Sequence, residues 1–179
     1  DYGNLALAPE RSRSYDIAIE KGERSGPLHL ALTAFRRDSR NLIDFVSCFS
    51  VSSPLCADGR FGFYENVGRA GAQGLEVELG SQVSERFRAQ AVYTYLKAKD
   101  RTPGGFNKGN DLARRPNHAV TISADWRTPL ADLALGADLR MVGDSFDDAA
   151  NGTRIDSHAL ATVRASLPVT GHFELFGRV

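Results

Sequence analysis

The two cysteines, Cys48 and Cys56, are the residues whose type and spacing predict the most definite chemistry. Both lie in one polar segment, close enough to pair, and a disulfide there would constrain a loop in an oxidising compartment. Two free thiols or a metal pair are the alternatives, although no histidine lies in the segment. We predict a structural disulfide that stiffens the loop, so that less entropy is lost when the loop meets a ligand.

Acidic side chains gather in a second polar segment, at Asp144, Asp147 and Asp148, with Asn151 close behind them. Carboxylate and amide oxygens are the hard ligands that Ca²⁺ prefers, so this segment is a candidate calcium site. A solvated loop without metal is the alternative, and the more common reading of such a cluster. Apart from this Ca²⁺, the sequence predicts no cofactor.

No arrangement of residues in the sequence predicts catalysis. A Gly-x-Ser-x-Gly nucleophile motif is absent from the sequence, so we predict that the protein is not an enzyme. The histidines are spread over separate segments without metal-ligand spacing: His29, His118, His158 and His172. The 22 Lys and Arg residues balance 22 Asp and Glu residues, and we predict no nucleic-acid partner.

The segment 63–79 predicts a β-strand with two unlike faces. The residues that alternate along it are Leu75, Val77 and Leu79 on one face and Glu76 and Glu78 on the other. A period of two is that of a pleated strand, and carboxylates on the second face mean that this face is wet. An apolar exterior around a polar interior is the pattern of a transmembrane β-barrel.

The same alternation recurs, and it predicts eight strands joined by connectors of alternating length. The predicted strands are 12–21, 28–45, 63–80, 86–99, 114–127, 132–142, 155–168 and 172–179. The short connectors are 22–27, 81–85, 128–131 and 169–171, and the long ones are 46–62, 100–113 and 143–154. This alternation puts all long loops at one end of an all-β, antiparallel up-and-down transmembrane barrel. A Greek-key sandwich is the alternative, and it predicts no such alternation.

The predicted faces assign individual side chains to lipid and to the lumen. Lipid-facing residues should be Leu75, Val77, Leu79, Val120, Ile122, Leu133, Leu135 and Leu139. Interface aromatics should be Tyr15, Tyr93, Tyr95 and Trp126. Charged lumen residues should be Asp16, Glu20, Glu76, Glu78, Arg88, Asp125, Asp138 and Arg140. This much charge suits a wide lumen around a polar plug better than a narrow packed interior.

Several segments, in this order and spacing, resemble the β-barrel of TonB-dependent outer-membrane receptors. They are Asn4-Leu5-Ala6-Leu7-Ala8-Pro9-Glu10-Arg11-Ser12-Arg13-Ser14-Tyr15-Asp16, Phe35-Arg36-Arg37-Asp38, Leu42-Ile43-Asp44-Phe45, Tyr64-Glu65-Asn66-Val67-Gly68-Arg69-Ala70, Gly74-Leu75-Glu76-Val77-Glu78, Tyr93-Thr94-Tyr95-Leu96-Lys97-Ala98-Lys99-Asp100 and Leu112-Ala113-Arg114-Arg115-Pro116. Ala6 stands where the family usually has proline. The segments 42–45 and 114–116 are most similar to the vitamin B12 (cobalamin) receptor branch, and catecholate-siderophore receptors share much of the pattern.

The resemblance implies that residues 1–179 are about eight consecutive strands of a 22-stranded barrel, with the plug domain and the last strand outside the chain. It implies active import of a scarce nutrient chelate across the outer membrane of a Gram-negative bacterium, energised through TonB. Cobalamin is the first candidate and a ferric siderophore the alternative; a passive porin-like or structural barrel is less favoured. The implied partners are outer-membrane lipid and lipopolysaccharide, the chelate, and TonB through the plug.

The pair Arg114 and Arg115, just before Pro116, would lie at the extracellular rim in this topology. Such a pair could hold a carboxylate of the barrel wall, a lipopolysaccharide phosphate or an anionic group of the substrate. The structural role is the favoured interpretation.

Overall fold

A computed structural model describes residues 2–49, 53–57 and 59–179 of the chain. Eight long strands make up almost all of its regular structure. They are β1 (Arg11–Lys21), β2 (His29–Ser47), β3 (Gly62–Ser84), β4 (Phe87–Asp100), β5 (His118–Arg127), β6 (Ala134–Val142), β9 (His158–Thr170) and β10 (Phe173–Arg178). The short elements are the 3-10 turn η1 (Pro54–Cys56) and the two-residue strands β7 (Ser145–Phe146) and β8 (Arg154–Ile155).

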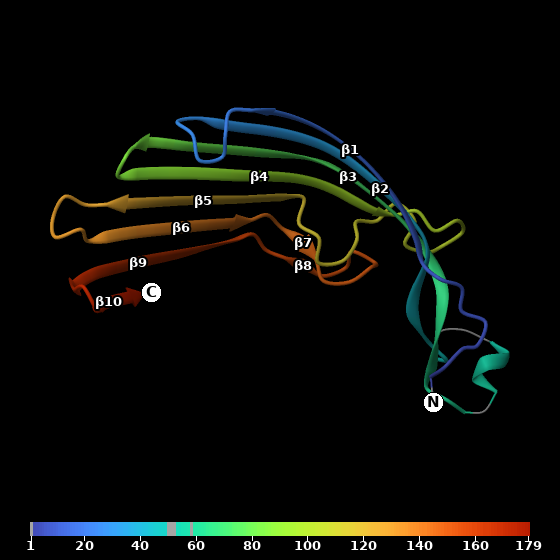
Figure 1. The fold of residues 1–179 in the computed structure, drawn as a ribbon. Helices are drawn as coiled ribbons and strands as arrows, with labels where there is room; N and C mark the ends of the chain where they lie inside the picture. The colour runs from blue at the N-terminus through green and yellow to red at the C-terminus, as the bar shows by residue number, and fades with distance from the viewer. Residues whose placement is uncertain (1, 50–52, 58) are drawn as a thin grey trace.

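The long strands form one antiparallel sheet in the order β1-β2-β3-β4-β5-β6-β9-β10, each paired with its neighbours in the chain. This meander confirms the predicted topology, and all three long connectors leave the sheet at the same end (Figure 1). None of the described segments forms a helix long and apolar enough to cross a membrane. The small β7–β8 hairpin lies inside the last long loop and was not predicted.

Strand ends differ from the predicted ones where the backbone geometry forbids pairing. The predicted strand 114–127 begins only at His118, because Arg114 has a positive φ and Pro116 has no N–H to donate. The predicted strand 132–142 begins at Ala134, since Ala131 and Asp132 both have positive φ and form the turn. The strand predicted at 155–168 runs from 158 to 170 for a related reason: residues 154 and 155 pair with β7 instead.

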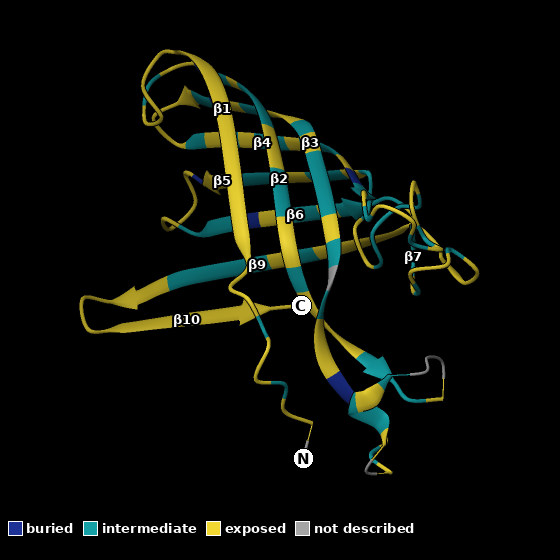
Figure 2. Cartoon of the chain, turned by 90° about the vertical axis from the view of Figure 1, so that its right-hand side faces the viewer, coloured by how far each residue is buried: buried dark blue, intermediate teal, exposed yellow. Residues whose placement is uncertain are grey.

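The sheet is strongly curved and its two edges stay apart, so it is an arc of a barrel wall (Figures 1 and 2). Within the described part of the chain, strands β1 and β10 each pair on one side only, and both are exposed along their whole length. A sheet edge in lipid leaves backbone groups without partners, which is why membrane barrels close. The edges of this arc therefore need further strands, as in a larger barrel.

The arc has almost no core of its own. Among the described residues only two apolar side chains, Phe63 and Ala98, are buried. The accessible surface is 12848 Å², whereas a compact globular chain of 19.5 kDa exposes about 8,500 Å². The apolar surface must therefore be covered by surroundings other than this chain, as lipid covers a barrel.

The predicted lipid-facing residues do share one face of the sheet. The cross-strand pairs Val77–Tyr93, Tyr93–Val120 and Val120–Met141 place the apolar rows of β3 to β6 side by side. Leu75, Leu79 and Ile122 are exposed. The other predicted members lie between neighbouring side chains and are half-buried: Val77, Val120, Leu133, Leu135 and Leu139. Trp126 marks this face near the short turns, and Tyr15, Tyr93 and Tyr95 mark it nearer the long loops.

Candidate functional site in the polar inner wall

A row of polar residues crosses the concave face of the sheet near its short turns. Register places these residues directly opposite one another on six strands, β3 to β6, β9 and β10: Gln82, Arg88, Asp125, Gly136, Arg164 and Arg178. Arg88 and Asp125 were predicted on the lumen face, and the register confirms that they share it with Asp138. Residues on this face alternate with the apolar outer residues because each strand is pleated.

Arg164 links two carboxylates from the two strands that precede its own in the sheet. Its guanidinium forms an ion pair with Asp138 on the adjacent strand β6, and its Nη2 lies 2.5 Å from Asp125 Oδ1 on β5. The path to Asp125 passes over Gly136, where an added Cβ would lie only 2.3 Å from Arg164 Nε. A side chain at position 136 would therefore occupy the space that Arg164 needs.

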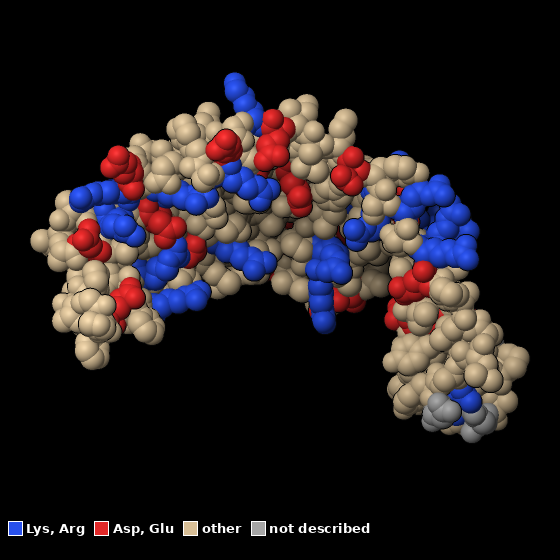
Figure 3. All heavy atoms as spheres, in the orientation of Figure 1, with Lys and Arg blue, Asp and Glu red and all other residues tan. Residues whose placement is uncertain are grey.

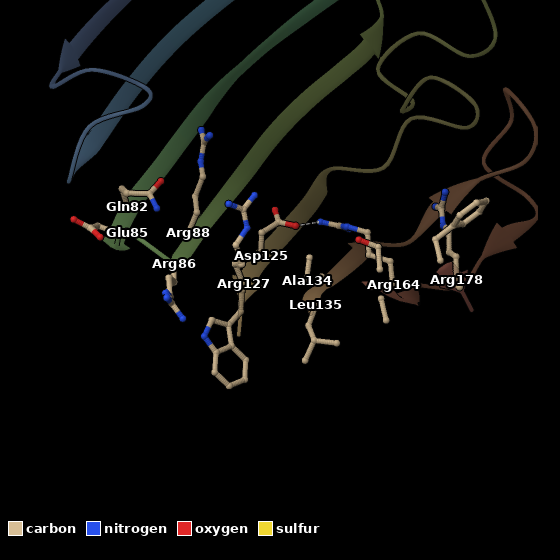
Figure 4. A pocket seen from close by; sticks show the side chains of 16 residues that line it. Gln82, Glu85, Arg86, Arg88, Asp125, Arg127, Ala134, Leu135, Arg164 and Arg178 are labelled. Atoms are coloured by element: carbon tan, nitrogen blue, oxygen red, sulfur yellow. Dashed lines mark hydrogen bonds and ion pairs between the residues drawn. The ribbon is translucent and has the colours of Figure 1, made fainter. Parts of the chain in front are cut away.

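This row lines an open cavity of about 580 Å³ at the short-turn end of the inner wall (Figure 4). The basic residues that line it are Arg86, Arg88, Arg127, Arg164 and Arg178, and the acidic ones are Glu85 and Asp125. In Figure 4, Arg88, Arg127 and Asp125 point to one side of the strands, whereas Arg86 and Leu135 point to the other. The cavity therefore presents a net positive wall, suited to carboxylate or other anionic groups of whatever fills the lumen.

A second cluster of polar and charged side chains lies on the inner wall beside the β1–β2 turn. The His29 side chain is 1% exposed, and its Nε2 lies 3.6 Å from Glu20 Oε1 and 3.7 Å from Glu78 Oε1. Arg24 approaches the same two carboxylates at 4.0 and 3.6 Å. Glu20 and Glu78 were both predicted on the lumen face. Through Arg24 they connect the first short turn to β1 and β3.

An aromatic cluster lies at the opposite end, where β2 and β3 project beyond the sheet. The rings of this cluster are Tyr2, Phe45, Phe49, Phe61 and Tyr64, with neighbouring centroids 5.4 to 6.1 Å apart. Each is more than a third exposed. Contiguous exposed aromatic surface of this kind is typical of ligand-binding surfaces. The cluster was not predicted, although four phenylalanines flank the two cysteines in the sequence.

The predicted disulfide falls beside this cluster. The sulfurs of Cys48 and Cys56 are 2.10 Å apart, and their Cα atoms are separated by 5.7 Å. The Cys48 N–H also donates to the Phe61 carbonyl oxygen at 2.9 Å, which holds the start of the loop against the end of the same loop. Residues 50–52 and 58 of the predicted loop 46–62 lie outside the described residues.

The two other long loops, 101–117 and 143–157, are joined by reciprocal hydrogen bonds. The Asp111 N–H donates to Asn151 Oδ1 and Asn151 Nδ2 donates to the Asp111 carbonyl oxygen, both at 2.9 Å. Asn110 Nδ2 adds a bond to the Ala149 carbonyl oxygen at 3.1 Å. The loops therefore form one unit above the ends of β4 to β9.

The three candidate calcium ligands each bind a different partner within this unit. Asp144 pairs with Arg154 at 3.2 Å and Asp147 with Arg114 at 2.7 Å. Asp148 accepts the backbone N–H groups of Gly152 and Thr153, which hold the pKa of its carboxyl below the usual value of 3.8. No group of three acidic, histidine or cysteine side chains in the described part of the chain has metal geometry. Calcium binding stays a prediction from the sequence.

Arg114 and Arg115 differ in their surroundings. Arg114 serves the loop unit, because its Nε binds Asp147 and its N–H donates to the Phe146 carbonyl oxygen at 2.7 Å. A carboxylate of the barrel wall was one of the predicted partners, but the carboxylate that Arg114 contacts belongs to a loop. Arg115 is exposed beside it.

The fold and the two unlike faces define a segment of an outer-membrane β-barrel, and comparison with known proteins identifies its family. The family model described as "TonB dependent receptor-like, beta-barrel" matches residues 1–179. The chain belongs to this family, whose members are β-barrels of the Gram-negative outer membrane.

Curated relatives agree with this assignment. The chain is 34% identical over 107 residues to the ferrioxamine receptor of Yersinia enterocolitica, which covers 59% of the chain and 15% of the relative. It is 27% identical over 175 residues to the ferrichrome outer membrane transporter/phage receptor of Escherichia coli, covering 94% of the chain and 22% of the relative. It is 28% identical over 181 residues to the vitamin B12 transporter BtuB of Photobacterium profundum, and the match covers 100% of the chain and 27% of the relative. The chain thus spans about a quarter or less of these relatives.

Solved structures show the same fold. The siderophore receptor PiuA from Acinetobacter baumannii superposes with a TM-score of 0.76 at 21% identity, covering 98% of this chain and 25% of that one. The ferric yersiniabactin uptake receptor FyuA from Yersinia pestis superposes with a TM-score of 0.74 at 15% identity, covering 93% and 24%.

Proposed function

We propose that this chain is part of a receptor that imports a scarce metal chelate across the outer membrane, energised through TonB and gated by a plug domain. The observation that carries the proposal is the inner wall of the sheet. Its open cavity and charged row form half of a polar interface, and a polar plug would supply the other half. A passive pore is the alternative, and it needs no such partner.

The aromatic cluster is the surface we assign to capture of the chelate. It lies at the long-loop end, beside a disulfide that limits the movement of the β2–β3 loop. Exposed rings supply large contact area at small entropic cost, and a stiffened loop loses less freedom on binding. Residues of the cluster would contact an apolar or aromatic part of the ligand.

Two classes of chelate are candidates, and each has its own support. Cobalamin is favoured by the segments 42–45 and 114–116 and by the similarity to the vitamin B12 transporter over the whole chain. A ferric siderophore is favoured equally by the similarity to the ferrioxamine receptor and the ferrichrome transporter. We propose cobalamin or a ferric siderophore as the ligand of the intact receptor.

Binding to the intact purified receptor decides between them. Titration with cobalamin, ferrioxamine B and ferrichrome, followed by tryptophan fluorescence, should give one ligand of submicromolar affinity. Uptake of that ligand by cells should stop when TonB is deleted. Uptake that is unchanged without TonB would show a passive pore, and failure of all three chelates would reject the proposed substrate classes.

Substitution in the aromatic cluster tests its role. Replacing Phe49 and Phe61 together by alanine should weaken chelate binding about 5- to 30-fold, the effect expected for loss of exposed aromatic anchors. The matched control is Phe106→Ala, which removes a fully exposed phenylalanine from the loop 101–117. Equal losses in both variants would remove the cluster from the ligand site.

A further inference from the structure

The loop 143–157 contains Asn151-Gly152, and Asn151 is the only asparagine in the sequence that is followed by glycine. Glycine has no side chain to keep its backbone nitrogen away from the preceding carboxamide, so this dipeptide favours attack of the nitrogen on the carboxamide. In that reaction the Gly152 nitrogen bonds to Asn151 Cγ, and Nδ2 leaves as ammonia that carries the Gly152 hydrogen. Water then opens the succinimide ring to aspartate or isoaspartate. The dipeptide is therefore a candidate site of spontaneous deamidation.

The nucleophile of this reaction is held by Asp148. The Gly152 N–H donates to Asp148 Oδ1 at 3.1 Å, and the Thr153 N–H donates to Oδ2 of the same carboxylate at 2.7 Å. The nitrogen attacks only after it has lost its hydrogen, and a hydrogen bond to a charged carboxylate stabilises the N–H form. The Asn151 N–H also donates to the Asp148 carbonyl oxygen at 3.2 Å, which keeps the turn closed. Asp148 therefore opposes the first step.

The electrophile is held by the neighbouring loop, 101–117. Asn151 Oδ1 accepts from the Asp111 N–H, and Asn151 Nδ2 donates to the Asp111 carbonyl oxygen, both at 2.9 Å. Nδ2 also donates to the Asp148 carbonyl oxygen at 3.4 Å. Any rotation of the carboxamide that the attack needs would break the two bonds to Asp111. Gly152 is exposed, so the water that the second step consumes has access to the turn.

The protection of Asn151 depends on the two loops staying together, because Asp111 and Asn151 belong to different loops. Arg114 Nε binds Asp147 Oδ1 at 2.7 Å between the same loops. Lys99 on β4 pairs with Asp111 at 3.2 Å and holds it to the sheet. Opposite charges are close neighbours elsewhere too, since acidic and basic side chains alternate over much of the visible face in Figure 3. Separation of the loops would release the Asn151 carboxamide.

Deamidation would break the link between the loops permanently. A carboxylate at position 151 has no N–H to donate, so one of its oxygens would face the Asp111 carbonyl oxygen, where a hydrogen bond of 2.9 Å now lies. Two acceptors that face each other lose the bond and cost free energy. The new negative charge would also join Asp144, Asp147 and Asp148 in one loop. The isoaspartate product would in addition lengthen the backbone at the turn.

We propose that Asn151 is a latent deamidation site that responds to separation of the two loops. While the loops are joined, Asp148 holds the nucleophile and Asp111 holds the carboxamide, and residue 151 stays an amide. When the loops separate, residue 151 converts to aspartate or isoaspartate, and the reciprocal pair with Asp111 cannot form again. The inference concerns the chemistry of the loops and is independent of which chelate the receptor imports.

The first test measures amide-to-acid conversion at Asn151, with Asn107 as internal reference, by peptide mass spectrometry of the intact receptor incubated in detergent at mildly alkaline pH. Folded wild type should convert Asn151 at least about tenfold more slowly than the same protein in guanidinium chloride, the effect of one or two lost hydrogen bonds. Asp148→Ala should remove most of this protection. The matched control, Asp144→Ala, removes a carboxylate of the same loop that pairs with Arg154 and should keep the protection. Heat-modifiable gel mobility reports that each variant is folded.

The second test measures the consequence for the loops. In Asn151→Asp, hydrogen exchange of the backbone amides in 101–117 and 143–157 should become faster in both loops together. Asn107→Asp makes the same chemical change outside the reciprocal pair, and it should leave exchange in 143–157 unchanged.

Any of four results at residue 151 would overturn the proposal. They are absence of conversion in unfolded wild type, equal conversion in folded and unfolded wild type, equal protection in wild type and Asp148→Ala, and equal losses of protection in Asp148→Ala and Asp144→Ala. Unchanged exchange in Asn151→Asp would equally contradict the claim that deamidation separates the loops. Chelate binding is not a readout of these tests, so their failure leaves the proposed import function as it stands.

Discussion

At the scale of single residues, Gly136 determines how the inner wall is connected. Its position between Asp125 and Arg164 in the same cross-strand row leaves the guanidinium a path across β6. An alanine Cβ would lie within 2.3 Å of Nε, so Arg164 would have to turn away from Asp125. The half-exposed pair itself should contribute only about 0.2–1 kcal/mol. The main effect of the pair is to hold the Arg164 guanidinium in one position on the lumen face.

A double-mutant cycle tests this path. In wild type, Asp125→Asn should lower the stability of the intact receptor in a urea refolding titration, whereas in a Gly136→Ala background it should have little further effect. Gly177→Ala is the control background, since an added Cβ there meets nothing within 4 Å. Full persistence of the Asp125 effect after Gly136→Ala would contradict the geometry.

The disulfide is the second prediction at this scale. Unreduced receptor should show no alkylatable thiol at Cys48 or Cys56 by mass spectrometry. Closing so short a loop should contribute about 2–3 kcal/mol to the order of the loop. Reduction should loosen the loop and weaken chelate capture without unfolding the barrel, because the hydrogen-bonded ladder does not depend on the bond. Two alkylatable thiols in native protein would refute the prediction.

At the level of the elements, strand β5 has one face toward lipid and one toward the lumen, because successive side chains of a pleated strand point in opposite directions. Ile122 faces lipid and its chain neighbour Thr121 faces the lumen. Ile122→Arg should therefore destabilise the receptor by about 2–4 kcal/mol in a bilayer refolding titration, and Thr121→Arg should cost less. The two substitutions add the same side chain one residue apart, so each controls for the other. Equal costs would remove the assignment of the faces.

The loop 143–157 should respond to acid through Asp148. The backbone N–H groups of Gly152 and Thr153 lower the pKa of its carboxyl in the folded state, below the 3.8 of the unfolded chain. Its contribution is therefore fully present above about pH 4 and is lost as pH falls through the lower folded pKa. The amide NMR signals of Gly152 and Thr153 should stay constant from pH 7 to 5 and shift only below about pH 4. Asp148→Asn should abolish that shift, and a transition near neutral pH would contradict the assignment.

At the scale of the whole molecule, the arc depends on strands and lipid that it does not contain. It buries little apolar surface, and among the described residues both edge strands lack a second partner strand. We expect residues 1–179 by themselves to remain unfolded in detergent, with no heat-modifiable mobility and with unshifted fluorescence of Trp126, the only tryptophan. The intact receptor, refolded in parallel, should show heat-modifiable mobility. Independent folding of the 179 residues would show that edge pairing is not required.

The strands, the order in which they pair and the face that each residue occupies could all be predicted from the sequence. Period-two alternation is local, and a meander joins neighbours in the chain, so the alternation alone assigns residues such as Val77 and Glu76 to opposite faces. The same local reasoning placed Cys48 and Cys56 in one loop. The prediction was wrong at the ends of strands, because the sequence gives no signal of the positive φ angles at Arg114 and Ala131.

The side chains that meet across strands could not be predicted from the sequence, because they depend on the register of the folded sheet. Register brings Arg164 over Gly136 to Asp125, and it aligns Arg40 between Arg11 and Arg69 on the outer face. The pairing of β2 with β3 shifts between Arg40 and Ile43, and such an irregularity has no periodic signal in the sequence. A shift of one residue turns every side chain of a strand to the other face, so the contacts of the inner wall follow from pairing geometry.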